Sequence, residues 1–379
     1  MNEEPIVPEP IAPSFDIELP DIPTPAVAVD NTVKDNVEVS FKFAFIGSGQ
    51  GGSRIAATFR KIGYNRVCAI NTSQQDLATL ALPAEAKMCI GGGGAGKNPG
   101  AAHQLFNEKR EDVLDLMRRC FGQTIDRTFV CIGAGGGTGS GTSLRLIETV
   151  RDLQVQLKCA TDKVGVIVSL PKTSEGSKVA ANAYATVEGL LKLVDEGTLS
   201  PLIILDNERI KDIYPGLAVD PFWATANQSV ASLFHLFNVV SCKQSSYTTF
   251  DAADFQTVLD SGLIVFGATP LAKWSDPTDI SYAIRENLKH NILCGGIDMS
   301  TGTVAGAVII GGQEILSQVP HESLDHGFEQ LTRLMRAGST VHRGIYKGDK
   351  SNLVAYTAIG GLSRPTVRLE QLRKLGRVE

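Results

Sequence analysis

A run of glycines constrains the fold of this chain more than any other feature. Residues 133–141 read Gly-Ala-Gly-Gly-Gly-Thr-Gly-Ser-Gly; they follow the apolar run Thr128–Ile132 and precede an amphipathic pattern that extends to Leu157. This order predicts a strand, a glycine loop and a helix. Because glycine has no side chain, the backbone can approach a ligand closely, and N–H groups at a helix N-terminus can bind an anion. We therefore predict a phosphate-binding loop. A flexible linker would not be held between a buried strand and an amphipathic helix.

A second glycine loop follows the first predicted strand of the chain. The apolar run Phe41–Ile46 leads into the pattern Gly47-x-Gly49-x-x-Gly52, and a helical pattern comes next. In this context GxGxxG is typical of a dinucleotide fold, so a nicotinamide-dependent oxidoreductase is one interpretation. The next predicted strand, however, ends at Asn71, where such enzymes commonly place an acidic residue for the ribose. This residue counts against the oxidoreductase.

A third glycine-rich stretch, residues 91–100, again lies between an apolar run and a predicted helix over 101–120. The carboxyl ends of parallel strands share one edge of a sheet, so we expect the three loops to meet in one crevice. One glycine loop can bind a diphosphate, whereas several suggest a triphosphate with its metal ion. Lys97 could approach the terminal phosphate, and an ordinary solvated loop lysine is an equally good interpretation.

Polar residues suited to a sugar and a base follow later strands. Glu175 and Asn207 come after the apolar runs 164–170 and 202–205. Both could accept hydrogen bonds from ribose hydroxyls, and Asn207 could instead contact the edge of the base, although spacing alone favours ordinary loop residues. A long apolar helix is predicted over 221–240. Near its start lie Trp223 and Asn227, which are four residues apart and could stack a purine and read its edge; core packing is the alternative.

The second half of the chain has a different pattern of motifs. Asp251 and Asp254 lie three apart at a predicted helix start, where an acidic cap is the ordinary explanation. Glycine-ended apolar strands and amphipathic helices then alternate from residue 262 to 359, which predicts a second α/β domain. A short basic tail is expected at 365–379.

Composition narrows the class of protein. The chain has 379 residues and seven cysteines, with no CxxC pair and no Cys/His cluster, so we expect free thiols in a reducing compartment. No apolar stretch is long enough to cross a membrane. Residues 1–38 contain seven prolines, nine acidic residues and one lysine, which is wrong for a signal peptide. We expect a cytoplasmic protein with an extended, largely disordered acidic tail. A passive extension is favoured over a segment that docks an adaptor.

Several of these motifs together resemble those of the tubulin/FtsZ superfamily. Residues 135–141 match its signature GGGTGSG, and the resemblance covers residues 41 to 364 in the family's order. By this resemblance, the residues implied to bind the nucleotide are Gly49, Gln50, Gly51, Gly52, Asn71, Gly94, Ala95, Gly96, Lys97, Asn98, Gly135, Gly136, Gly137, Thr138, Gly139, Ser140, Glu175, Asn207, Trp223 and Asn227, with Asn227 reading the guanine.

The resemblance also implies a fold and a mechanism. The fold would be α/β: a Rossmann-like GTP-binding domain with a parallel sheet (41–215), a long central helix (216–248) and a smaller α/β domain with a mixed sheet that activates the GTPase (249–364). Residues 1–40, which have no counterpart in the family pattern, and residues 365–379 are expected from their composition to be tails. GTP or GDP with Mg²⁺ would bind one subunit, and Asp251 and Asp254 of the next subunit in a homopolymer would complete the catalytic site. Hydrolysis would then depend on assembly.

Departures from the family pattern bear on the cellular role. Val179 takes the place of an arginine near the ribose, which bears on the sugar contacts. We also expect the globular part to end without the long C-terminal linker and partner-recruiting peptide of the cell-division members. This expectation favours a plasmid- or phage-encoded filament that positions or segregates DNA in a bacterial cell or phage-infected host, with nucleic acid contacted only indirectly. A cell-division protein is the alternative. A non-hydrolysing structural paralogue is a further one, against which the intact Asp pair argues.

Overall fold

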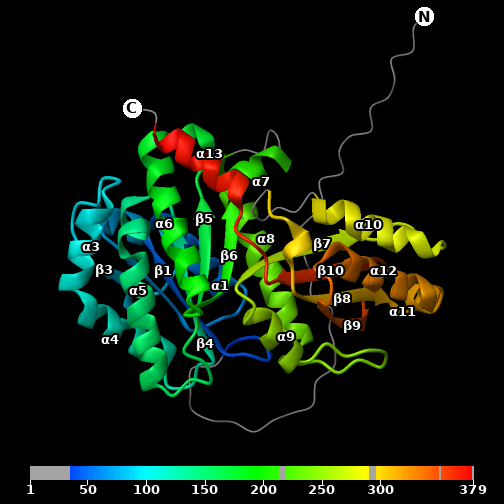
Figure 1. The fold of residues 1–379 in the computed structure, drawn as a ribbon. Helices are drawn as coiled ribbons and strands as arrows, with labels where there is room; N and C mark the ends of the chain where they lie inside the picture. Colours follow the sequence, from blue (N-terminus) through cyan, green and yellow to red (C-terminus); the bar gives the residue numbers. More distant parts are fainter. Residues whose placement is uncertain (1–34, 214–218, 290–295, 350, 378–379) are drawn as a thin grey trace, which may run out of the picture.

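The computed structural model describes residues 35–213, 219–289, 296–349 and 351–377 (Figure 1). Most of the predicted acidic tail therefore lies outside the described residues. The described end of this segment is packed against the body, because Asp35 forms a buried ion pair of 2.6 Å with Arg66. No helix within the described ranges is long and apolar enough to cross a membrane.

Strands and helices alternate along most of the chain. In order, the elements are β1 (Phe43–Ser48), α1 (Gly49–Lys61), β2 (Val67–Asn71), α2 (Gln74–Ala78), β3 (Lys87–Cys89), α3 (Pro99–Glu108), α4 (Arg110–Phe121), β4 (Arg127–Gly133), α5 (Gly137–Gln156), β5 (Val164–Leu170), α6 (Ser177–Asp195), β6 (Leu199–Asp206), α7 (Asn207–Ile213), α8 (Val219–Val240), α9 (Ala252–Leu259), β7 (Leu263–Pro270), α10 (Pro277–Lys289), β8 (Val304–Gly312), α11 (Gln313–Leu316), α12 (His321–Leu334), β9 (Thr340–Gly348), β10 (Leu353–Gly360) and α13 (Thr366–Gly376).

The strands of the described chain form one sheet in the order β3-β2-β1-β4-β5-β6-β7-β10-β8-β9. All neighbouring pairs are parallel except those that β10 makes with β7 and β8. The predicted α/β fold, with a parallel sheet followed by a mixed one, is confirmed. The two parts join where β6 pairs with β7 through only two residue pairs, Leu202 with Leu263 and Ile203 with Ile264.

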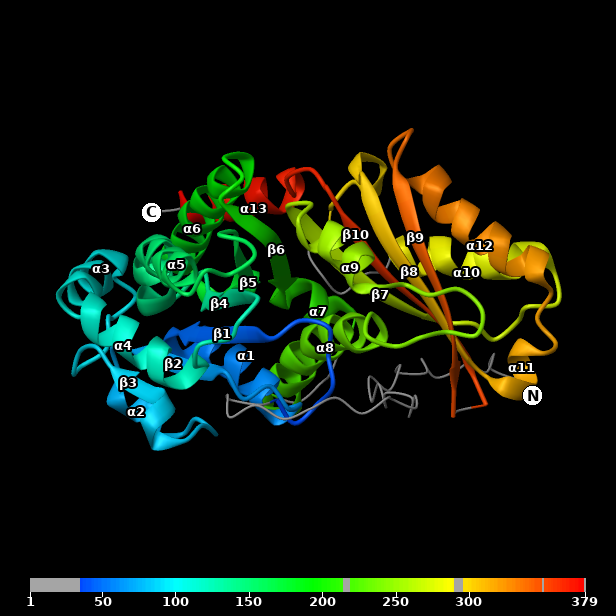
Figure 2. The same cartoon turned by 90° about the horizontal axis from the view of Figure 1, so that it is seen from below.

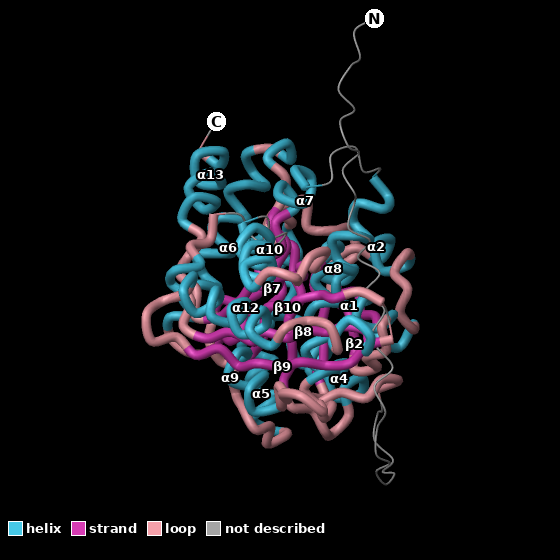
Figure 3. Tube along the Cα trace, turned by 90° about the vertical axis from the view of Figure 1, so that its right-hand side faces the viewer, coloured by secondary structure: helices cyan, strands magenta, loops and turns pink. Residues whose placement is uncertain are grey.

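Helices cover both faces of the sheet. Helices α5, α6 and α13 lie on one face, and α1 and α8 lie on the other (Figures 2 and 3). Helices α10 and α12 pack together beside the strands of the second half. This is the layered arrangement that parallel strands require, since both faces of such a sheet must be covered.

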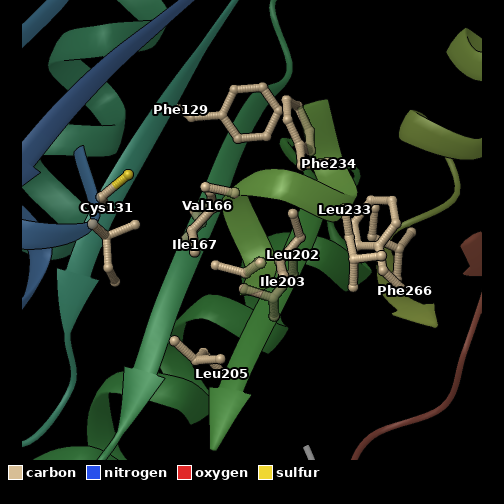
Figure 4. Close-up of a cluster of buried hydrophobic side chains, with 14 of the residues drawn as sticks. Phe129, Cys131, Val166, Ile167, Leu202, Ile203, Leu205, Leu233, Phe234 and Phe266 are labelled. Carbon is tan, nitrogen blue, oxygen red and sulfur yellow. The ribbon is translucent and has the colours of Figure 1, made fainter. Parts of the chain in front are cut away.

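The core between α8 and the sheet is aromatic. Phe234 of α8 packs against Phe43 and Phe129, with ring centroids 5.1 and 4.9 Å apart, and all three rings are buried. Figure 4 shows Phe234 beside Phe129, with Leu233 and Phe266 on the side toward β7. The prediction of a buried central helix is therefore confirmed. It links the two halves of the sheet through side chains.

Three elements differ from the sequence-based expectation. The helix predicted over 101–120 is broken at Lys109 into α3 and α4. Strand β9 was not predicted, because it carries no clear apolar alternation. The predicted basic tail forms helix α13, which packs on α6 and buries Arg368.

Candidate functional site

A cavity of about 470 Å³ lies at the carboxyl ends of β1, β2, β4, β5 and β6. It is lined by the predicted binding residues other than Gly52, Asn98 and Ser140. Further residues line the cavity that were not among the predicted binding residues: Ser48, Arg54, Thr72, Ser73, Asp76, Gly133, Ser169, Pro171 and Val179. Of these, Gly133 belongs to the predicted phosphate-binding loop, and Val179 was expected near the ribose. The cavity thus collects the ends of five parallel strands, where ligands of open α/β sheets bind.

The N-terminus of α5 forms the floor of one end of the cavity. This helix of 20 residues begins at Gly137, and no side chain caps it. The third glycine loop lies directly against it, since a Cβ on Gly137 would be 2.8 Å from the Ala95 Cβ and the Asn98 N. Its free N–H groups and the positive end of its dipole are thereby presented to the cavity, which suits a phosphate.

Hydrogen bonds between neighbouring loops fix the polar wall beside this helix. The Thr138 and Thr72 hydroxyl oxygens are 2.7 Å apart, and Thr138 also donates to Asn71 Oδ1 at 3.4 Å. Asn71 in turn donates through Nδ2 to Asp76 Oδ2 at 3.1 Å. This chain of contacts joins β2, α2 and α5, and it orients Asp76 as the carboxylate of this end of the cavity.

Two cations lie at the rim. Lys97 is exposed and has a φ of 57°, a left-handed conformation that is uncommon for a residue with a side chain. Its carbonyl oxygen accepts from Asn182 Nδ2 at 3.2 Å, which ties the loop tip to α6. Arg54 is exposed on α1, one turn after Gln50, and also lines the cavity. Both positive charges are placed at the anion-binding end.

The opposite end of the cavity offers amides and an aromatic ring. Asn207 is buried, and its Oδ1 has no hydrogen-bond partner within the described residues. Asn227 is also buried, one helical turn after the half-buried Trp223. The ammonium of Lys172 lies 5.5 Å from the Trp223 ring centroid. A buried carbonyl oxygen without a partner is costly, so a ligand that donates a hydrogen bond to Asn207 would be stabilised.

Helix α13 anchors the loops beside this end. Arg368 is buried; its Nη2 donates to the Pro171 carbonyl at 2.7 Å and to Asp206 Oδ1 at 3.1 Å. Burial raises the pKa of Asp206, and the neighbouring Arg368 charge only partly opposes it. The pair holds the ends of β5 and β6, from which the loops of Glu175 and Asn207 begin.

A second contact fixes the same loop. Glu208 accepts from the Thr173 N–H at 2.5 Å and from the Thr173 hydroxyl at 2.8 Å. Burial alone would raise the pKa of Glu208, but hydrogen bonds from Lys211 and Thr173 outweigh it and lower the pKa to about 2. The loop before Glu175 is thus held by an ionised carboxylate at neutral pH.

Asp251 and Asp254 lie away from the cavity. They flank the N-terminus of α9 as reciprocal caps, each side chain accepting from the other residue's N–H. The end of α9 contacts the start of β4, since Arg127 donates to the Leu259 carbonyl at 3.1 Å. The cavity lies at the other end of this seven-residue strand, about 20 Å away. Figure 1 shows α7, which follows β6, and α9 at opposite ends of the molecule.

The three predicted binding residues outside the cavity lining have other contacts. Gly52 lets α1 approach β4, since a Cβ there would be 2.0 Å from the Cys131 carbonyl oxygen. Asn98 caps α3, and the Ser140 hydroxyl donates to the Ala134 carbonyl. Val179, where an arginine was expected, is buried against Gly135 and lines the cavity.

Comparisons with known proteins agree with this arrangement. The model of the Tubulin/FtsZ family GTPase domain matches residues 42–215. The chain is 25% identical over 251 residues to the tubulin-like protein TubZ of Bacillus cereus, covering 60% of this chain and 55% of that protein. It is 26% identical over 328 residues to the tubulin-like protein CetZ of Pyrococcus abyssi, covering 84% of each. The match thus spans only about half the length of the TubZ relative.

Solved structures share the fold. A GTPγS-form protofilament of TubZ from Bacillus thuringiensis serovar israelensis superposes with a TM-score of 0.79 over 90% of this chain and 92% of that one, at 21% identity. At this identity the likeness establishes the fold. The similarity includes both the cavity half and the half that carries β7–β10.

Proposed function

We propose, from the premise that the chain belongs to the tubulin/FtsZ family of GTPases, that it binds GTP in the cavity and assembles head to tail. It would hydrolyse GTP only where a neighbouring subunit contributes Asp251 and Asp254. One observation supports the proposal. The phosphate-binding loops line the cavity at the carboxyl end of β4, whereas α9, which begins at the two aspartates, contacts the opposite end of that strand through Leu259. The cavity and the carboxylate pair would then be two halves of a catalytic site that face different neighbours.

The nucleotide would lie along the cavity with its phosphates at the N-terminus of α5. The glycine loops and the rim cations Arg54 and Lys97 support this orientation, because they supply N–H donors and positive charge. The base and ribose would then lie near Asn207, Trp223 and Asn227. The unpartnered Oδ1 of Asn207 would accept from a donor of the nucleoside. The oxidoreductase alternative leaves the other glycine loops without a role.

The donor set at the phosphate end also fits Mg²⁺. Asp76 and Asn71 are hard oxygen ligands, and Mg²⁺ typically takes one or two carboxylates together with phosphate oxygens and water. No group of three or more His, Cys, Asp or Glu side chains that could hold a metal ion exists in the described ranges. Asp76 and Asn71 would hold such an ion, which would neutralise the charge of the phosphates.

If one subunit placed both carboxylates beside its own nucleotide, their negative charges would repel the three phosphates. Supplied by a neighbour, Asp251 and Asp254 orient and polarise the attacking water only after assembly. Phosphoryl transfer needs mainly positioning and charge stabilisation, so a carboxylate pair with a metal ion suffices. Loss of the terminal phosphate then weakens the contact between subunits.

Alanine variants of the two aspartates test this proposal. We expect Asp251→Ala and Asp254→Ala to bind GTP and sediment as filaments, yet to lose phosphate release by at least a hundredfold, the scale of general base catalysis. Phosphate release and pelleting should be measured on the same samples. Phosphate release at the wild-type rate in both variants would refute the assignment.

For the cellular role, we propose that the filament positions or segregates DNA, by analogy with one similar solved structure, a TubZ of type III plasmid segregation. A division protein is the alternative. Deleting the gene separates them: rising loss of the replicon that encodes it supports segregation, and long undivided cells support division.

A further inference from the structure

The edge strand β9 holds the segment that carries the two aspartates. Alternate residues of a strand point to the same side, and three on β9 contact this segment. The Tyr346 hydroxyl accepts from the Phe250 N–H at 2.9 Å and donates to the Phe250 carbonyl at 3.0 Å. Gly344 lies so near that a Cβ would be 2.8 Å from the Phe250 Cβ. The third residue, His342, reaches Asp254.

The contact of His342 with Asp254 is short and partly shielded. Nδ1 of His342 lies 2.5 Å from Oδ1 of Asp254, and the two side chains are 20% and 24% exposed. The other ring nitrogen, Nε2, is buried and has no partner in the described part of the chain. A proton on Nδ1 suits both ends of the ring: it donates to the carboxylate, and it leaves no N–H on Nε2 without an acceptor.

Helix capping does not account for this contact. Asp251 Oδ1 accepts from the Asp254 N–H at 2.9 Å, and Asp254 Oδ2 accepts from the Asp251 N–H at 3.1 Å. The reciprocal cap of α9 is complete with these two bonds. It uses only Oδ2 of Asp254, so the contact at Oδ1 adds a constraint on the direction of that carboxylate. Asp251, by contrast, is exposed.

We propose that His342 is a positioning residue for GTP hydrolysis, which fixes the carboxylate of Asp254 so that its remaining lone pairs meet the attacking water in the neighbouring subunit's site. This inference rests on the proposed function. Each carboxylate oxygen has two acceptor sites, so Oδ1 and Oδ2 can bind water while retaining their internal partners. His342 touches neither water nor nucleotide; it acts through Asp254.

Turnover per polymerised subunit measures this role. We expect His342→Ala to lower it about ten- to a hundredfold, the scale of a misplaced catalytic group. Affinity for GTP and the critical concentration should change less than twofold, because His342 lies outside the cavity. His342→Asn, whose amide N–H can replace Nδ1–H, should recover most of the rate. His342→Gln, whose amide extends toward the Nε2 position, should not.

A double variant separates positioning from general support of the fold. If His342 acts through Asp254, the variant Asp254→Asn/His342→Ala should hydrolyse GTP at the same rate as Asp254→Asn. The matched control is His321→Ala on α12, which removes an exposed histidine 3.0 Å from Asp325 and should leave turnover unchanged.

Three results would overturn the inference alone: wild-type turnover in His342→Ala filaments, equal rates in the Asn and Gln variants, or a further loss in the double variant. The Asn and Gln comparison keeps the test decisive if His342→Ala does not fold. If the wild type releases no phosphate, or both aspartate variants retain its turnover, the proposed function fails as well, so the two failures are distinguishable.

Discussion

At the scale of single residues, two glycines near the cavity have opposite surroundings. A Cβ on Gly52 would overlap the Cys131 carbonyl, whereas the nearest atom to a Cβ on Gly136 is 4.0 Å away. We expect Gly52→Ala to lower the free energy of unfolding by about 1–3 kcal/mol, because α1 must shift from β4. Gly136→Ala should leave it within about 0.5 kcal/mol.

The variants of these two glycines distinguish an effect on folding from an effect on GTP binding. Gly136 lines the cavity at the start of α5, so its added methyl group would occupy the approach of a phosphate. We expect Gly136→Ala to weaken GTP binding at least tenfold in calorimetric titration, while its denaturation curve overlays that of the wild type. A variant that binds GTP normally would remove this loop from the phosphate site.

Sequence reasoning found the glycine loops because their function is encoded locally, in residues that lack side chains between a strand and a helix. It did not find Arg54 or Asp76. Each lines the cavity because of its position around the axis of its helix. The residue type alone does not show which way the side chain points. The contact of His342 with Asp254 joins segments far apart in sequence, so no local pattern could reveal it.

At the scale of elements, α8 is tied to the rest by a buried polar network. His235 Nδ1 lies 3.1 Å from the Tyr64 hydroxyl, to which Asn238 also donates at 3.1 Å. Asn238 additionally donates to the Phe41 carbonyl at 3.0 Å. Burial lowers the pKa of His235 to about 4. The helix is therefore docked with a neutral histidine in its interface.

This network makes stability depend on pH. An unfolded histidine binds a proton below about pH 6.5, whereas folded His235 does so only below about pH 4, so acidification favours the unfolded chain between these values. We expect His235 to account for about 3 kcal/mol of lost stability across that window. Urea unfolding at several pH values should show the loss.

The variant His235→Gln should remove that part of the pH dependence, because glutamine does not titrate. His326→Gln, which replaces an exposed histidine on α12, is the matched control and should retain it. An unchanged slope in His235→Gln would contradict the assignment of the effect to α8.

Elements with a strong pattern were predicted, and those without one were not. The long apolar run of α8 and the strands that end in glycine loops stand out in sequence because they are buried. Strand β9 lies at the sheet edge and mixes polar, aromatic and glycine residues, so its strand character depends on pairing with β8. The sequence of helix α13 looks like that of a basic tail, because the pairing of Arg368 with Asp206 inside the fold is visible only in the structure.

At the scale of the whole molecule, a catalytic site that is divided between two subunits predicts that the rate of GTP hydrolysis depends on protein concentration. We expect phosphate release per subunit to be near zero at low protein concentration and to rise to a constant value once filaments pellet with GTP. GDP should support less pelleting. A rate per subunit that is independent of concentration would place the complete catalytic site within one chain.

The junction between β6 and β7 has a mechanical consequence. Two residue pairs join the parallel part of the sheet to the mixed part, while β8 and β9 share nine. Twisting one half against the other would strain few hydrogen bonds between these two strands, so much of the resistance to torsion must come from side chains, among them the aromatic rings around α8. The β6–β7 junction is therefore a point at which the sheet can twist. Changing the size of the rings beside Phe234 should alter the torsional stiffness at this junction without altering any strand.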